Sequence, residues 1–166
     1  MKKLILLPFL LLSIIGWSQN AESYFDLAMK NSKAGNAEAA IADYDKAIEL
    51  SPSFGEAYLN RSIEKIKLNN FESALVDANK ALEINADNTY AYLTRANIYY
   101  KLENYPAALT DSNMVIKTNT KDPASYNLRG LTYAQLKDKK NACADFAKAQ
   151  QLGSQNATEN LQTYCK

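Results

Sequence analysis

The chain has 166 residues, a formal net charge of +1 and a hydrophobic content of 47%, which suits one folded domain with a sizeable core and excludes a disordered chain. The near balance of acidic and basic residues gives no electrostatic reason to expect nucleic-acid binding. There is no histidine, which excludes Ser-His and Cys-His nucleophilic pairs, histidine metal ligands and imidazole acid–base catalysis.

Residues 1–18 are predicted to be a cleavable signal peptide. A short basic start precedes an apolar run over residues 4–15, and Gly16 and Ser18 place small side chains at the −3 and −1 positions of a cleavage site, as signal peptidase requires. An uncleaved membrane anchor is the alternative, but a bilayer span needs about 20 apolar residues and this run is shorter. No cysteine follows the apolar run, so a lipoprotein anchor is not indicated. We therefore expect a periplasmic or secreted protein with no membrane insertion after cleavage.

Residues 19–166 are predicted to form one domain that contains four repeats of equal length. The repeats run over residues 21–54, 55–88, 89–122 and 123–156. Counting places from the first residue of each repeat, place 4 is always tyrosine, at Tyr24, Tyr58, Tyr92 and Tyr126. Place 20 is always alanine, at Ala40, Ala74, Ala108 and Ala142. Place 8 is always small, at Ala28, Ser62, Ala96 and Gly130. Apolar residues spaced three and four apart indicate amphipathic helices, and the small residues allow two helices to approach closely.

This pattern resembles the tetratricopeptide repeat family over residues 21 to about 156. The resemblance implies an all-α fold, a right-handed solenoid of helix-turn-helix repeats whose first helices line a concave groove. Repeat 1 carries the late proline of the family, Pro52, whereas Ala86 and Thr120 stand at that place in the next two repeats. Because the last repeat of a stack needs a cap, residues 157–166 are predicted to form a capping helix.

Arginine and aspartate recur in register inside the repeats. Place 7 is occupied by Leu27, Arg61, Arg95 and Arg129. Place 23 is occupied by Asp43, Asp77, Asp111 and Asp145. The two places lie at similar height in an antiparallel hairpin, so we predict structural ion pairs in preference to a ligand site. Both pairings stay open, since Arg61 has Asp77 in its own repeat and Asp43 in the repeat before.

The resemblance also implies a partner-binding groove on the first helices. The residues predicted to line it are Phe25, Met29, Ile63, Tyr90, Asn97, Tyr100, Lys101 and Asn127. The amides suit the backbone of an extended peptide, whereas the apolar side chains suit an amphipathic helix. Some members of the family clamp a terminal carboxylate with Lys, Asn and Arg. Of those places only Asn60 agrees, and the others hold Phe25, Met29, Tyr90 and Thr94, so this ligand is not expected.

The chain has two cysteines, Cys143 and Cys165, both in the capping region. In an oxidising compartment we predict a structural disulfide, which closes a loop long enough to contribute roughly 3 kcal/mol. Free thiols and a redox pair are the alternatives, although the spacing is not that of a CxxC site. A zinc site would need two more ligands, so no metal is expected.

Together these features predict a protein-interaction module or adaptor, monomeric and without cofactor, whose protein or peptide partner the sequence does not identify. An enzyme is not expected, because a glycine-rich phosphate loop, a nucleophile elbow and carboxylate pairs outside the repeat pattern are all missing from the sequence. The alternative is a structural scaffold of the cell envelope that assembles end to end. A capping helix argues against such stacking.

Overall fold

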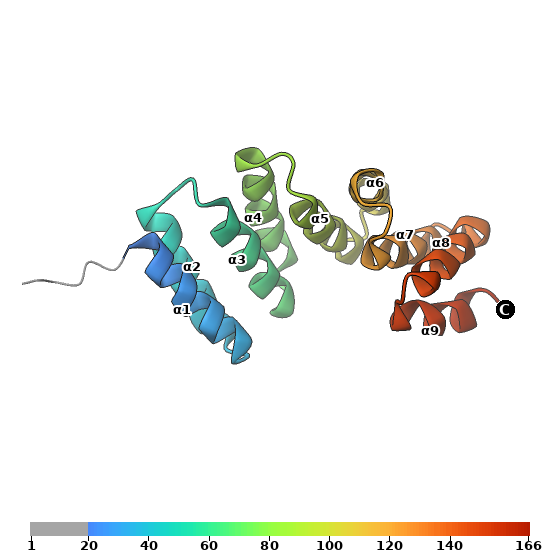
Figure 1. Ribbon diagram of the computed structural model, residues 1–166, viewed down its shortest axis with the longest axis horizontal. Helices are drawn as coiled ribbons and strands as arrows, with labels where there is room; N and C mark the ends of the chain where they lie inside the picture. Colours follow the sequence, from blue (N-terminus) through green and yellow to red (C-terminus); the bar gives the residue numbers. More distant parts are fainter. Residues whose placement is uncertain (1–19) are drawn as a thin grey trace, which may run out of the picture.

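The computed structural model describes residues 20–166, and the predicted signal peptide lies outside that range. The first helices of the four repeats are α1 (Ala21–Lys33), α3 (Gly55–Lys67), α5 (Thr89–Lys101) and α7 (Pro123–Gln135). The second helices are α2 (Ala37–Leu50), α4 (Phe71–Ile84), α6 (Tyr105–Thr118) and α8 (Lys139–Gln151). A terminal helix, α9 (Gln155–Tyr164), follows. The hairpins succeed one another along the long axis of the molecule (Figure 1), so the predicted all-α repeat solenoid is confirmed. None of these helices is long and apolar enough to cross a bilayer.

One residue in each hairpin turn adopts a left-handed conformation. The φ angle is +80° at Gly35, +60° at Asn69, +59° at Glu103 and +63° at Lys137. The N–H of the residue that follows donates a hydrogen bond back to a carbonyl group of the first helix. In repeat 1, for example, Asn36 N–H donates to the carbonyl of Asn31 at 2.9 Å. This motif satisfies carbonyl groups at the end of the helix and directs the second helix back along the first.

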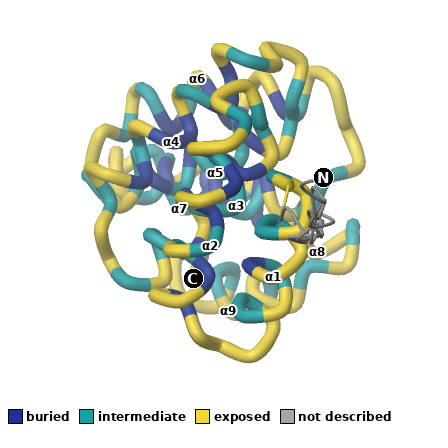
Figure 2. Tube along the Cα trace, turned by 90° about the vertical axis from the view of Figure 1, so that its left-hand side faces the viewer, coloured by how far each residue is buried: buried dark blue, intermediate teal, exposed yellow. Residues whose placement is uncertain are grey.

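In the first and the last repeat, the two helices of the hairpin pack a small residue at place 8 against an aromatic residue at place 24. In repeat 1 a small Ala28 is buried in the same cluster as Tyr44. In repeat 4 the fit is tighter, because a Cβ atom added to Gly130 would lie 2.7 Å from the ring of Phe146. The middle repeats hold small residues at both places. Buried segments lie where helices face one another, while most turns are exposed (Figure 2).

The terminal helix begins earlier than predicted. Helices α3, α5 and α7 each begin at the first place of their repeat, whereas α9 begins at Gln155, two places before the next repeat would start. Gly153 in the connection has a φ of +95°, a conformation that glycine adopts without steric cost. Helix α9 therefore covers residues 155–164 and not the predicted 157–166. Its third residue, Ala157, is fully buried like Ala91, the third residue of α5.

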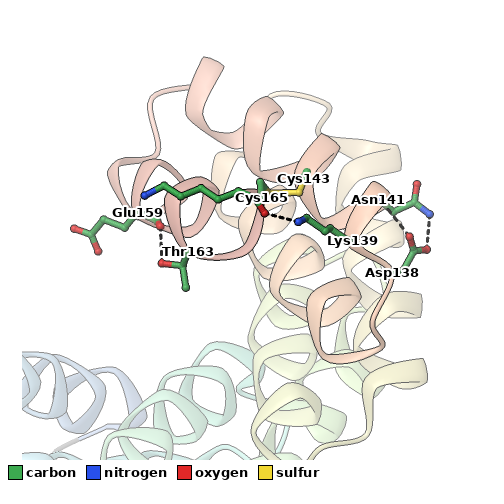
Figure 3. Close-up of a disulfide and its surroundings, with 8 residues drawn as sticks. Asp138, Lys139, Asn141, Cys143, Glu159, Thr163 and Cys165 are labelled. Carbon is green, nitrogen blue, oxygen red and sulfur yellow. Dashed lines mark hydrogen bonds between the residues drawn. A yellow bond between two sulfur atoms is a disulfide. The ribbon is translucent and has the colours of Figure 1, made fainter.

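The end of α9 is fastened to α8. Cys143 and Cys165 form a disulfide with a Cα–Cα distance of 5.7 Å (Figure 3). The ring of Tyr164 stacks on Phe146 at a centroid distance of 5.7 Å. Lys139 Nζ donates a hydrogen bond to the carbonyl of residue 166 at 2.6 Å. The capping helix is thus held by a covalent bond, an aromatic contact and a polar contact.

Candidate functional site

The arginines of place 7 bind aspartates of their own repeat. Arg95 donates from Nε to one carboxylate oxygen of Asp111 at 2.7 Å and from Nη2 to the other at 2.9 Å. Arg129 binds Asp145 in the same bidentate manner, with both distances 2.7 Å. Arg61 does so with Asp77, and Lys65 adds a second cation there at 2.8 Å. Of the two pairings that the sequence leaves open, the structure has the one within repeats.

The remaining guanidinium nitrogen of each arginine reaches the preceding repeat. Nη1 donates to place 25 of that repeat: Arg61 to Asp45 at 2.5 Å, Arg95 to Asn79 at 2.9 Å and Arg129 to Asn113 at 2.6 Å. Arg95 also lies over the rings of Tyr92 and Tyr99, at 5.5 and 5.8 Å from their centroids, which favours the cation. Each arginine therefore joins two repeats.

Asp43 is the exception, and its predicted ion pair is wrong. Its carboxylate accepts a hydrogen bond from the Asn31 amide at 2.7 Å, and no salt bridge to it is found within residues 20–166. Repeat 1 has Leu27 at place 7, and Arg61 of the next repeat reaches Asp45 instead. The cause is helical geometry, since place 25 and not place 23 turns toward the following repeat.

The three arginines of these pairs are not available to a ligand, because each is bound to internal partners. Hydrogen bonding to Asp111 raises the pKa of Arg95 above its ordinary value despite partial burial, and Asp145 does the same for Arg129. Burial lowers the pKa of Arg61, but hydrogen bonds and charge from Asp77 and Asp45 outweigh it, so the net pKa is also raised. These guanidinium groups are charged and committed to internal partners.

A groove of about 400 Å³ crosses three first helices, α3, α5 and α7. Its apolar walls are Ile63, Ile66, Leu93, Leu128 and Leu131, together with Ala124. Its polar groups are Lys67, Thr94, Asn97 and Asn127. The path is diagonal, from the C-terminal half of α3 through the middle of α5 to the N-terminal and middle parts of α7. Three of the residues predicted to line a binding groove meet here: Ile63, Asn97 and Asn127.

Phe25 and Met29 lie elsewhere, in the core of repeat 1. The Phe25 ring stacks on Phe54 at 4.8 Å and is tilted against Tyr44 at 5.7 Å. Tyr44 donates its hydroxyl hydrogen to the sulfur of Met29 at 3.1 Å. Both side chains are partly buried against the core cluster of repeat 1, and they do not line this groove, whose residues come from α3, α5 and α7.

The three other predicted groove residues also lie outside it. Tyr90 is 76% exposed and borders a smaller cleft of about 70 Å³. Tyr100 packs against Tyr105 at 5.9 Å and accepts a hydrogen bond from Gln135 at 3.5 Å. Lys101 is exposed at the end of α5. Tyr90 lies at the start of α5 and Tyr100 and Lys101 lie at its end, whereas the groove crosses the middle of that helix.

Glu64, a buried acid beside the groove, was not predicted. Its residue is 2% exposed, and its carboxylate accepts hydrogen bonds from Ser32 at 2.6 Å and from Lys67 at 2.7 and 2.9 Å. The two Lys67 contacts neutralise the buried charge. In the sequence, the one signal was Lys67 on the next turn of the helix, since place 10 has no recurrent residue type.

A family model described as tetratricopeptide repeat matches residues 21–54, 55–88 and 123–156, which is more than half of the chain. The chain belongs to the tetratricopeptide repeat family. Proteins of this family are typically interaction modules without catalytic activity, and the chain is accordingly a module for binding proteins or peptides.

Solved structures share this fold. MamA superposes with a TM-score of 0.76 at 20% identity, over 84% of this chain and 81% of MamA. YrrB, described as a tetratricopeptide repeat protein with an unusual peptide-binding site, gives 0.73 at 24% identity, over 85% and 74%. The first such domain of Spaghetti (RPAP3), bound to the HSP90 peptide SRMEEVD, gives 0.69 at 25% identity, over 72% and 94%. No curated protein matches the sequence.

Proposed function

We propose that this protein is an adaptor that works outside the cytoplasm and binds a neutral, largely apolar segment of a partner protein in the groove across α3, α5 and α7. The observation that carries the proposal is the groove itself. A hollow of about 400 Å³ with apolar walls and a few convergent polar groups has the composition of a ligand site.

The charge of the groove supports a neutral segment. Among the described residues that line it, Lys67 alone carries a charge, and the carboxylate of Glu64 offsets that charge at 2.7 Å. An acidic peptide would gain little from such a cation. The domain of RPAP3 binds the acidic peptide SRMEEVD, whereas here the places of a carboxylate clamp hold Phe25, Met29 and Tyr90.

The proposed location depends on two features of the chain. Residues 1–18 have the basic, apolar and small-residue layout of a signal peptide. The disulfide between Cys143 and Cys165 is of a kind that persists in oxidising compartments and is rare in the cytoplasm. Periplasm and release from the cell both satisfy these features.

The groove is tested by introducing a charge inside it and outside it. Ile63 lines the groove and is 36% exposed, while Val76 lies on the second helix α4 and is 67% exposed. We expect Ile63→Asp to abolish the partners that wild type captures from an envelope extract, because a carboxylate would have to be desolvated beside apolar walls. Val76→Asp, the matched control, is expected to keep them.

The measurement is quantitative mass spectrometry of proteins captured by the three forms, after circular dichroism has established that each is folded. Capture of the same partners by Ile63→Asp would place binding outside the groove. The location is tested separately by sequencing the N-terminus of the protein isolated from a cell envelope fraction. A chain that still begins at Met1 contradicts signal cleavage.

A further inference from the structure

An amide of the groove is held by the capping helix. Asn160 on α9 donates a hydrogen bond from Nδ2 to Oδ1 of Asn127 on α7 at 2.8 Å. Both side chains are partly buried. Asn127 lines the groove, whereas Asn160 does not. One hydrogen bond therefore connects the end cap of the solenoid with the proposed binding surface.

That hydrogen bond determines which end of the Asn127 amide a ligand meets. A side-chain amide has one acceptor oxygen and one nitrogen with two donor hydrogens. The oxygen faces Asn160, and the Asn127 nitrogen makes no hydrogen bond within residues 20–166. The nitrogen is thus the group available in the groove. Asn97, the other groove amide, has neither end bonded within the same range.

The position of Asn160 is itself fixed. Helix α9 is joined to α8 by the disulfide of Cys143 with Cys165 (Figure 3), and Gln150 Nε2 donates to the hydroxyl of Thr158 at 3.1 Å. With its far end bonded covalently and its middle bonded to α8, α9 has little freedom to slide or turn. Asn160 therefore presents its donor to Asn127 in one orientation.

We infer that Asn160 is a positioning residue of the binding site: it orients the Asn127 amide so that Nδ2 donates a hydrogen bond to a backbone carbonyl of the partner. This inference rests on the proposed function. It also specifies the occupant, which is an extended segment. The carbonyl groups inside a helix already accept hydrogen bonds from their own chain, whereas an extended peptide leaves its carbonyls free for side-chain amides.

The substitution Asn160→Asp tests the orientation directly. The introduced carboxylate only accepts hydrogen bonds, so Asn127 has to turn its nitrogen toward α9 and its oxygen toward the groove. Asn156→Asp makes the same change on an exposed part of α9 and is the matched control. Asn160→Ala removes the constraint without reversing it.

The first readout needs no ligand. In NMR spectra of the oxidised protein we expect slow hydrogen exchange at the side-chain amide of Asn160 and fast exchange at that of Asn127. In Asn160→Asp, exchange at the Asn127 amide is expected to become slow. Slow exchange at Asn127 in wild type would mean that the amide is oriented the other way, and the inference would be wrong.

The second readout uses a phage-displayed library of random linear peptides, selected on wild type and then measured as synthetic peptides. We expect Asn160→Asp to weaken binding about tenfold, since one hydrogen bond is lost and an acceptor faces an acceptor. Asn160→Ala is expected to weaken it about threefold, and Asn156→Asp to leave it unchanged. On a background of Asn127→Ala, Asn160→Asp should have no further effect, because Asn160 acts through Asn127.

The outcomes separate the two proposals. Selected peptides whose binding is unaffected by Asn160→Asp would overturn the inference and leave the groove proposal standing. If Asn160→Asp weakens peptide binding by the same factor on the Asn127→Ala background as it does in the wild-type protein, Asn160 does not act through Asn127. The effect would then be a general one on the fold, and the inference would be overturned. If no peptide is selected, the proposed function fails, and the amide exchange still decides the orientation of Asn127.

Discussion

The first and the last repeat have the same architecture but different means of holding it together. Repeat 1 packs Ala28 against Tyr44, and its Asp43 has a neutral partner. Repeat 4 pairs Gly130 with Phe146, binds Asp145 through a bidentate arginine and is covered by α9. Since stability in a solenoid is roughly a sum over repeats and their interfaces, the N-terminal end should open first and the C-terminal end last.

Substitutions at the aspartates of place 23 and their partners are expected to give the largest difference in free energy of unfolding between the two repeats. Arg129→Ala leaves Asp145, which is 6% exposed, as a buried charge without its cation, and should lower the free energy of unfolding by about 3–5 kcal/mol. Asp43→Ala removes one hydrogen bond to Asn31 and should cost about 1 kcal/mol. Urea unfolding followed by circular dichroism measures both. Equal losses would show that the arginine pairs do not distinguish the repeats.

Removal of the disulfide should give the next largest loss in the free energy of unfolding. The double variant Cys143→Ser, Cys165→Ser is expected to lose roughly 3 kcal/mol, because the loop between the two positions is no longer closed in the unfolded chain. Hydrogen exchange should accelerate in α8 and α9 and stay unchanged in α1 and α2. Acceleration spread evenly over all helices would indicate that the cap supports the whole solenoid and not its own end.

Gly130 provides a sharper comparison of packing. Alanine is the better helix former by about 1 kcal/mol, yet Gly130→Ala should destabilise by about 1–3 kcal/mol, because its Cβ would collide with the Phe146 ring 2.7 Å away. The reverse change in repeat 1, Ala28→Gly, should cost about 1 kcal/mol through helix propensity and about 1 kcal/mol more through the loss of a buried methyl group. Thermal unfolding of both variants is the measurement. A stabilised Gly130→Ala would mean that the two helices adjust their separation easily.

The smallest effect at neutral pH concerns Tyr44. Burial, with a further contribution from the charge of Glu64, raises the pKa of Tyr44 from 10.0 to about 12. The folded state holds this proton more tightly than the unfolded state, so the associated stability is complete below pH 10 and is lost as the pH rises toward 12. The total is on the order of 2–3 kcal/mol.

Tyr44→Phe removes this alkaline loss, and Phe146 at the same place of repeat 4 shows that phenylalanine fits there. At neutral pH the variant should lose under about 1 kcal/mol, since the hydroxyl makes one weak bond to the Met29 sulfur. Urea unfolding of both proteins near pH 8 and near pH 11.5 measures the difference. If their stabilities fall in parallel with rising pH, the tyrosine is not the source of the alkaline sensitivity.

The helices could be predicted because each hairpin packs mostly against itself and its neighbours, so the same small and aromatic residues recur at places 4, 8 and 20. The arginine pairs were predictable for the same reason. Glu64 was not, because the residues at place 10 of the other repeats are Lys30, Ile98 and Thr132, which share no chemical character. Its burial depends on contacts with α1 that one repeat alone makes.

The groove was predicted only in part, because its outline depends on side chains that differ between repeats. Ile63, Asn97 and Asn127 line it. Phe25 and Met29 do not, since both side chains are partly buried against the core cluster of repeat 1. The role of Asn160 could not have been predicted by extending the repeat frame, because α8 and the connection after it are both shorter than their counterparts in the other repeats.

The shorter α8 and the shorter connection after it also determine where a further repeat could be joined to the protein. A further repeat joined after residue 156, where the repeat frame would put the boundary, starts too late and turns its small residues away from α7 and α8. Joined after Ser154 in place of α9, the same repeat begins where Gln155 does now and presents its third residue where Ala157 is buried. In design terms, an added repeat has to begin two residues earlier than the repeat frame would place it.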